Sequence, residues 1–149
     1  MGGMYSQFST NKELETKGIT LDYGLFRVQV ARAGGSNKKF QRVYESETKP
    51  YRFMMQQGTL DDKKSEAVFH TIFAKACILG WETKTGEDEK GEPIFEQGIE
   101  APDGSLLEVT VDNITKTFRN LPDLFMDIKE QCMSPALFRQ ELLEKDVKN

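Results

Sequence analysis

The chain has 149 residues, of which 38% are hydrophobic and 30% are charged, and its formal net charge at pH 7 is −4. This length suits one ordinary domain, and the acidic balance argues against a nucleic-acid partner, because phosphate-backbone binding requires clustered lysine and arginine. No stretch approaches the about 20 apolar residues that span a bilayer, so no membrane partner is expected. Cys77 and Cys132 form no CxxC pattern and are expected as reduced thiols in the core, with a disulfide as the alternative.

Residues 1–23 are rich in Gly, Ser, Thr, Lys and Glu, and their few apolar residues follow no sustained period. This composition predicts a flexible N-terminal arm, although its last residues could join the fold. The arm is either a frayed terminus or a segment that orders on contact with a partner. A single α+β domain is expected over residues 24–146.

The next segment combines a strand pattern with a helix pattern. Residues 25–32 alternate apolar and polar side chains, which predicts a half-buried strand, and a Gly-Gly-Ser-Asn turn follows it. Residues 38–57 then predict a helix that Pro50 divides into two short helices or kinks, because proline lacks an N–H and clashes with the preceding turn. A strand over residues 39–45 that pairs back onto residues 25–32 is the alternative.

Residues 59–77 carry the clearest helix pattern. Thr59 is a plausible N-cap, and the acidic residues that follow it favour the first turn of a helix. The apolar side chains recur at helical spacing from Val68 to Cys77, and this spacing predicts one buried face. His70 is expected on the opposite, solvated face.

The rest of the chain predicts a hairpin followed by helices. Strands are expected over residues 78–83 and 93–95, with an acidic, glycine-containing turn between them. Residues 110–121 predict a helix, Pro122 opens another, and Ser134 followed by a proline begins the last one. The expected fold class is therefore α+β, with a small antiparallel sheet of two to three strands packed by four to five helices.

The sequence has no pattern that predicts catalysis. His70 has neither a nucleophile nor a carboxylate at a telling spacing, and one histidine with two distant cysteines does not form a metal-binding pattern. The glycine-containing segment 86–91 fits neither a Walker loop nor an EF-hand loop. We therefore expect a non-enzymatic protein without cofactor or metal.

One segment suggests a binding surface, because aromatic residues alternate with basic residues and are followed by two methionines. Aromatic and methionine side chains adapt to loosely specific protein partners. The same pattern also occurs in an amphipathic helix with its aromatics turned inward, and in proteins that bind single-stranded nucleic acid, the least favoured alternative. The candidate partner-binding residues are Phe40, Tyr44, Tyr51, Phe53, Met54 and Met55.

The order of motifs resembles that of a family of small phage proteins. A Phe-Arg-Val-Gln-Val-Ala-Arg strand is followed by a Lys-Pro-Tyr-Arg segment, an acidic-started helix, a strand with the only tryptophan and a Leu-Pro-Asp-Leu segment. In this order, the motifs are residues 26–32, 49–52, 59–77, 78–82 and 121–124, and the similarity extends to Phe138. In this order they are similar to the tail assembly chaperones of long, non-contractile-tailed bacteriophages.

This resemblance implies a chaperone that binds the tape-measure protein, keeps this long helix soluble and recruits tail-tube protein in the host cell cytoplasm. It also implies that the chain is absent from the mature virion. A structural tail component, such as a tube or connector subunit, is the alternative. A homo-oligomer is compatible with either function, and Trp81 is expected in the core rather than in a contact.

Overall fold

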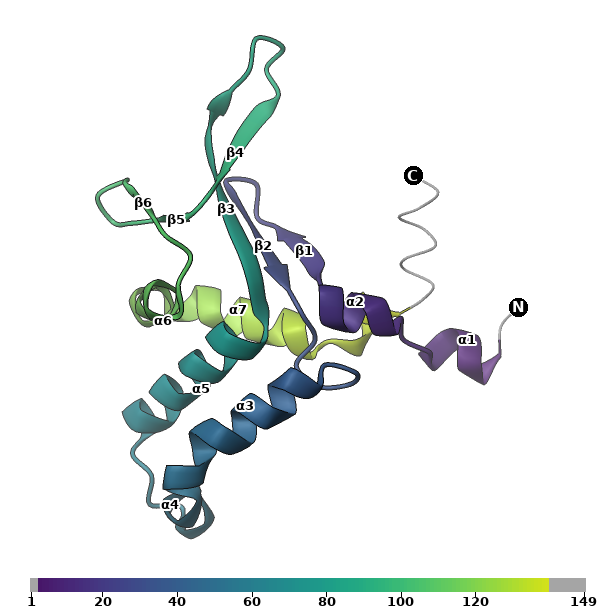
Figure 1. The fold of residues 1–149 in the computed structure, drawn as a ribbon, viewed down its shortest axis with the longest axis vertical. Helices are drawn as coiled ribbons and strands as arrows, with labels where there is room; N and C mark the ends of the chain where they lie inside the picture. Colours follow the sequence, from purple (N-terminus) through teal and green to yellow (C-terminus); the bar gives the residue numbers. More distant parts are fainter. Residues whose placement is uncertain (1–2, 140–149) are drawn as a thin grey trace.

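The computed structural model describes residues 3–139 and shows an α+β fold with a tall β-hairpin at one end (Figure 1). In chain order, its elements are α1 (Met4–Phe8), α2 (Lys12–Lys17), β1 (Ile19–Asp22), β2 (Phe26–Val30), α3 (Lys38–Thr48), the 3-10 turn η1 (Lys49–Tyr51), α4 (Arg52–Gln57), α5 (Asp62–Ala76), β3 (Ile78–Glu87), β4 (Pro93–Gln97), β5 (Ile99–Glu100), β6 (Leu106–Leu107), α6 (Val111–Asn120), α7 (Pro122–Met133) and the 3-10 turn η2 (Pro135–Phe138).

Strands β1 to β4 form one antiparallel sheet in chain order. Val28 lies at its centre, opposite Leu21 on β1 and Trp81 on β3. Val28 and Val30 are fully buried while Gln29 between them is exposed, which confirms the half-buried strand predicted from alternation. The sequence analysis expected two to three strands and did not predict β1, β5 or β6. In the described part of the chain the sheet has four strands, and β5 and β6 form a separate two-stranded sheet.

Strand β3 is longer than predicted and continues with β4 into a hairpin that stands clear of the helices (Figure 1). The chain leaves this hairpin at Gly98, where φ is +146°. A side chain at this position would overlap with Leu106, because the backbone of Gly98 lies against the leucine as β5 and β6 fold back toward the body. Gly98 therefore allows the turn that brings β5 beside β3.

The helices cover one face of the sheet and enclose an aromatic core. Helix α5 carries Phe73, whose ring lies 5.8 Å from that of Phe125 on α7, and Phe118 on α6 lies 4.9 Å from Phe125. All three rings are at most 4% exposed. Burial of these apolar faces, rather than helix propensity alone, stabilises helices of this length.

The helices predicted from the sequence are largely confirmed. Proline at position 50 lies in the turn η1, which joins α3 to α4, so the strand alternative over residues 39–45 is wrong. Helix α5 begins later than expected, with Asp61 rather than Thr59 as the N-cap. Thr110 caps α6 and Pro122 opens α7 as predicted, and the last helical segment is only a 3-10 turn within the described residues.

The segment predicted as a flexible arm over residues 1–23 joins the fold over its second half, which is more than the last residues that the sequence analysis allowed for. Residues from Asn11 to Asp22 form α2 and β1, and β1 pairs with β2 along its whole length. Ile19 and Leu21 point toward the core within a segment that is otherwise polar. Two apolar positions are too few to reveal a strand period in the sequence. In the fold they are enough to give β1 an inward face, because β1 is also held by its pairing with β2.

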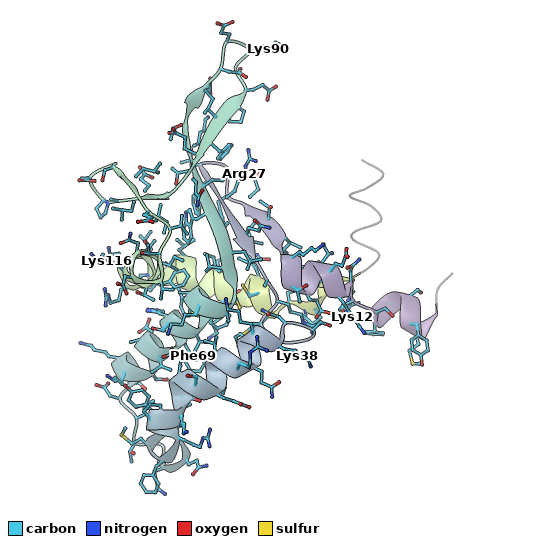
Figure 2. The ribbon with its side chains drawn as sticks, viewed as in Figure 1. Lys12, Arg27, Lys38, Phe69, Lys90 and Lys116 are labelled. Atoms are coloured by element: carbon cyan, nitrogen blue, oxygen red, sulfur yellow. The ribbon has the colours of Figure 1, made fainter. Side chains whose placement is uncertain are left out.

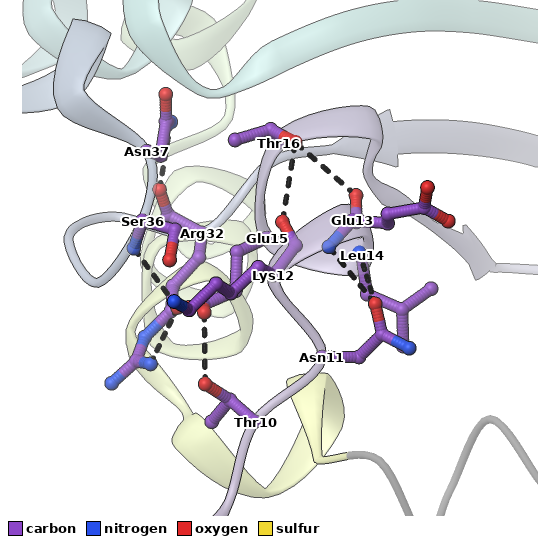
Figure 3. A network of polar contacts seen from close by, with 10 residues as sticks. All are labelled: Thr10, Asn11, Lys12, Glu13, Leu14, Glu15, Thr16, Arg32, Ser36 and Asn37. Carbon is purple, nitrogen blue, oxygen red and sulfur yellow. Dashed lines mark hydrogen bonds and ion pairs between the residues drawn. The ribbon is translucent and has the colours of Figure 1, made fainter.

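A buried ion pair fastens α2 to the loop that follows β2 (Figure 3). The carboxylate of Glu15 accepts hydrogen bonds from Thr10 Oγ1 at 2.8 Å, Arg32 Nη1 at 2.7 Å and the backbone N–H of Ser36 at 3.3 Å. Burial opposes ionisation, but these hydrogen bonds and the Arg32 charge outweigh it and lower the pKa of Glu15. Helix α2 is thus held by a satisfied charge, whereas β1 is held by its pairing with β2 and its two inward-facing apolar residues.

His70 is buried, which contradicts its predicted place on a solvated face. It is 2% exposed, its ring centre lies 4.4 Å from that of Phe125, and neither ring nitrogen has a hydrogen-bond partner. Burial lowers its pKa and outweighs the opposing charge of Glu66, whose Oε1 lies 3.7 Å from Nε2, and the smaller effect of Arg119 also lowers the pKa. The prediction failed because α6 and α7 cover a side of α5 that the apolar stripe does not mark.

The two cysteines are buried in the core, as predicted. Cys77 ends α5 and Cys132 lies on α7. The backbone N–H of Ala31 donates to the carbonyl of Cys77, and that of Ala33 donates to the carbonyl of Cys132. The neighbouring Cys132 and burial together raise the pKa of the Cys77 thiol, which favours its protonated form.

Candidate partner-binding site

An apolar groove of about 350 Å³ lies between the sheet and the junction of α6 with α7. It brings together the tryptophan strand and the Leu-Pro-Asp-Leu segment, which are far apart in the sequence. A second hollow of about 320 Å³ continues it toward β6 and shares part of its lining. The groove is lined by Phe26, Trp81, Thr83, Ile99, Glu100, Thr117, Asn120, Leu121, Pro122, Asp123 and Leu124.

A sharp turn between two helices places the outer wall of this groove. Leu121 ends α6 and precedes α7, with φ of −127° and ψ of 75°, so its backbone leaves the helical conformation for one residue. Its N–H bonds to Thr117 O, and its carbonyl accepts from the N–H groups of Leu124 and Phe125. Because Pro122 suits the first turn of a helix, α7 starts at once, and the side chain of Leu121 stays 53% exposed.

The floor of the groove is aromatic and firmly held. Trp81 is 5% exposed, and its ring stacks 5.9 Å from that of Phe26 and lies 6.5 Å from that of Phe118. Phe26 stacks in turn on Tyr23, whose hydroxyl donates to Asp127 Oδ2 on α7 at 2.5 Å. Burial and this hydrogen bond raise the pKa of Tyr23, so the hydroxyl remains a donor and links the turn between β1 and β2 to α7.

The rim of the groove is acidic. Glu100 and Asp123 are exposed, and neither forms an ion pair among the described residues. No basic side chain lines the groove itself, and Lys116, on α6, lines only the adjoining hollow (Figure 2). An apolar floor with an acidic rim suits an apolar anchor that has a basic group beside it.

The six residues predicted to bind a partner do not line this groove. Phe40 and Tyr44 lie on α3 and pack against α5, with ring centres 5.6 Å from Phe73 and 6.2 Å from Phe69. They are half-buried and form part of the contact between the two helices, which is the inward-facing alternative of the sequence analysis. Phe69 marks this contact in Figure 2.

The other four predicted residues lie at the end of the molecule opposite the β3–β4 hairpin (Figure 1). Phe53 is 72% exposed and Met54 is 38% exposed on α4, while Met55 is half-buried. Tyr51 is also half-buried, and Lys64 Nζ lies 5.3 Å from its ring centre. The predicted set is therefore divided between a helix contact and an exposed apolar end, which we call the α4 knob and define as Arg52, Phe53 and Met54.

The sequence analysis did not identify the groove as a site. It expected Trp81 in the core, and the residue is indeed buried, although it also lines the groove. The exposed leucine of a Leu-Pro pair between two predicted helices was the available signal for Leu121. Nothing in the sequence indicated that β5 would bring Ile99 and Glu100 to the same place.

The described residues contain no group of three or more His, Cys, Asp or Glu side chains arranged to hold a metal ion. Across residues 3–139, no helix is both long enough and apolar enough to cross a membrane. Comparisons with models of known families, with curated proteins and with solved structures found no match.

Proposed function

We propose that this protein is a non-enzymatic tail assembly chaperone of a long, non-contractile-tailed phage. In this proposal it binds amphipathic helical segments of the tape-measure protein in the apolar groove and keeps that protein soluble. It would act in the host cell cytoplasm, help to recruit tail-tube protein, and be absent from the finished virion. The resemblance in motif order supports this proposal.

The groove between Trp81 and Leu121 is the single observation that carries the proposal. The two motifs on which the resemblance rests most specifically lie in distant parts of the sequence, yet they form the floor and the wall of one apolar hollow. A groove of this kind accepts the apolar face of a helix, which is a common mode of peptide recognition. A long amphipathic helix that is not yet enclosed by the tail tube exposes such an apolar face and tends to aggregate unless a partner binds it.

The direct test is to co-express this chain with the tape-measure protein of the same genome and to measure how much of the latter stays soluble and co-purifies. The variant Leu121→Asp places a charge in the wall of the groove and should abolish co-purification. Ile94→Asp, an equal exchange at a 43% exposed position on the hairpin, is the matched control and should not. Both variants should keep the wild-type circular dichroism spectrum.

The contrary result would be an insoluble tape-measure protein with this chain alone in the supernatant. Mass spectrometry of purified particles then distinguishes the alternative function. A structural tube or connector subunit would be present in many copies, whereas a chaperone would be missing.

A further inference from the structure

The α4 knob is an exposed apolar surface that the rest of the described chain does not cover. Helix α4 has no buried residue, although three of its six residues are Phe53, Met54 and Met55. The segment that contains it, from Lys49 to Leu60, has two basic residues and no acidic one, although Asp61 and Asp62 follow directly. Aromatic, methionine and arginine side chains are all enriched in protein interfaces.

The groove is complementary to the α4 knob in both apolarity and charge. Its floor is aromatic, its lining includes two unpaired carboxylates, and its volume lies in the range of about 300–1,000 Å³ of pockets that enclose a ligand. None of its lining residues belongs to α3, η1, α4 or α5, so the two surfaces are on separate parts of the molecule. The groove and the α4 knob of one copy are therefore both open to other molecules.

We propose that the α4 knob of one copy docks into the groove of a second copy. Phe53 and Met54 would cover Trp81 and Leu121, and Arg52 would face the acidic rim. The occupant is a second copy of this chain because apolar surface and opposite charge match on both sides of the contact. The contact does not require the tape-measure protein, although in the proposed function a client segment would have to displace the knob.

This contact joins two different patches, so it is a heterologous contact rather than a symmetric dimer. A pair keeps one unused groove on one copy and one unused knob on the other, so the assembly grows until it closes into a ring or continues as a chain. Self-association should therefore depend on protein concentration. It should weaken with added salt because the charges at the rim are exposed to solvent.

The test uses two variants that each remove one side of the contact. Phe53→Asp damages the knob and leaves the groove, whereas Leu121→Asp damages the groove and leaves the knob. Analytical ultracentrifugation should show concentration-dependent assembly of the wild type and of the control Ile94→Asp. Each variant alone should lose about 30-fold or more in association constant, as expected for a hot-spot residue.

Mixing the two variants provides the sharpest result. The Phe53→Asp chain still offers a groove and the Leu121→Asp chain still offers a knob, so the mixture should form a one-to-one pair and nothing larger. Trp81, the only tryptophan of the chain, lies in the groove floor and should change its fluorescence when the pair forms. If Leu121→Asp misfolds, Arg52→Glu and Asp123→Lys provide a second test. Each variant alone should associate more weakly than the wild type, and mixing the two should restore assembly because opposite charges then meet at both kinds of contact.

Three outcomes would overturn the proposal. These are a wild type that stays monomeric at every concentration, two folded variants that assemble like the wild type, and two folded variants that do not pair when mixed. The proposed function would fail differently, because it predicts that Phe53→Asp retains the tape-measure protein and that Leu121→Asp loses it. Self-association without client binding, or the reverse, would separate the two proposals.

Discussion

Helices α2 and α4 have the same length of six residues but opposite relations to the fold. Helix α2 has a polar sequence, Lys-Glu-Leu-Glu-Thr-Lys, yet it is held against the body by the buried carboxylate of Glu15. Helix α4 is rich in apolar residues, yet none of them is fully buried. From composition alone, α4 would be expected to pack against the body and α2 to be exposed. The structure shows that a satisfied charge can anchor a polar segment, while an apolar segment without a partner stays exposed.

The largest expected effect is the loss of the anchor of α2. Glu15→Gln should lower the free energy of unfolding by about 3 kcal/mol, because it leaves Arg32 without its charge partner in a poorly hydrated site. Urea denaturation measures this change. Glu13→Gln, on the same helix with a 78% exposed side chain, is the matched control and should cost no more than about 0.5 kcal/mol.

Lowering the pH should reduce the difference in the free energy of unfolding between the wild type and Glu15→Gln. The folded state lowers the pKa of Glu15 below its ordinary value of 4.5, so the unfolded chain takes up the proton first as the pH falls. The stabilisation is therefore complete above pH 4.5 and is lost as the pH falls through the folded pKa. A difference between the two proteins that persisted unchanged at the lowest pH would show that the carboxylate charge is not the anchor.

A smaller effect compares two glycines with similar backbones. Gly35 has φ of +55° and faces Glu15, while Gly58, which ends α4, has φ of +69° and nothing within 4 Å of an added side chain. Alanine at either position would be strained by the left-handed backbone conformation. Only at Gly35 would the added methyl group also overlap with Glu15 Oε2. Gly35→Ala should therefore be less stable than Gly58→Ala by about 1–2 kcal/mol in thermal unfolding. Equal losses would mean that the loop moves freely away from α2.

The smallest expected effect on stability is at the α4 knob. Phe53→Asp should change the free energy of unfolding by no more than about 0.5 kcal/mol, because the ring is 72% exposed and supports no core contact. Chemical denaturation of the isolated monomer at low concentration measures this value. A loss of several kcal/mol would instead place Phe53 in the core and remove the difference between α2 and α4.

Local patterns in the sequence predicted most of the helices and the central strands. The alternation around Val28, the caps at Thr110 and Pro122 and the break at Pro50 depend on neighbouring residues, so they can be recognised without the rest of the fold. Strand β1 and the burial of His70 could not be predicted in this way. Both depend on surfaces supplied by distant segments, namely β2 for the strand and α6 with α7 for the histidine.

The two candidate sites also differ in whether neighbouring residues or distant segments determine them. The sequence by itself determined that Phe53 and Met54 lie in a short basic and apolar segment, because proline at position 50 and the glycine at position 58 limit the helix from both sides. Only the tertiary structure decided that this segment is exposed and that Trp81, Ile99 and Leu121 enclose a groove. The physical reason is that a side chain's type and local backbone follow from its neighbours in sequence, whereas its exposure depends on which distant elements fold against it.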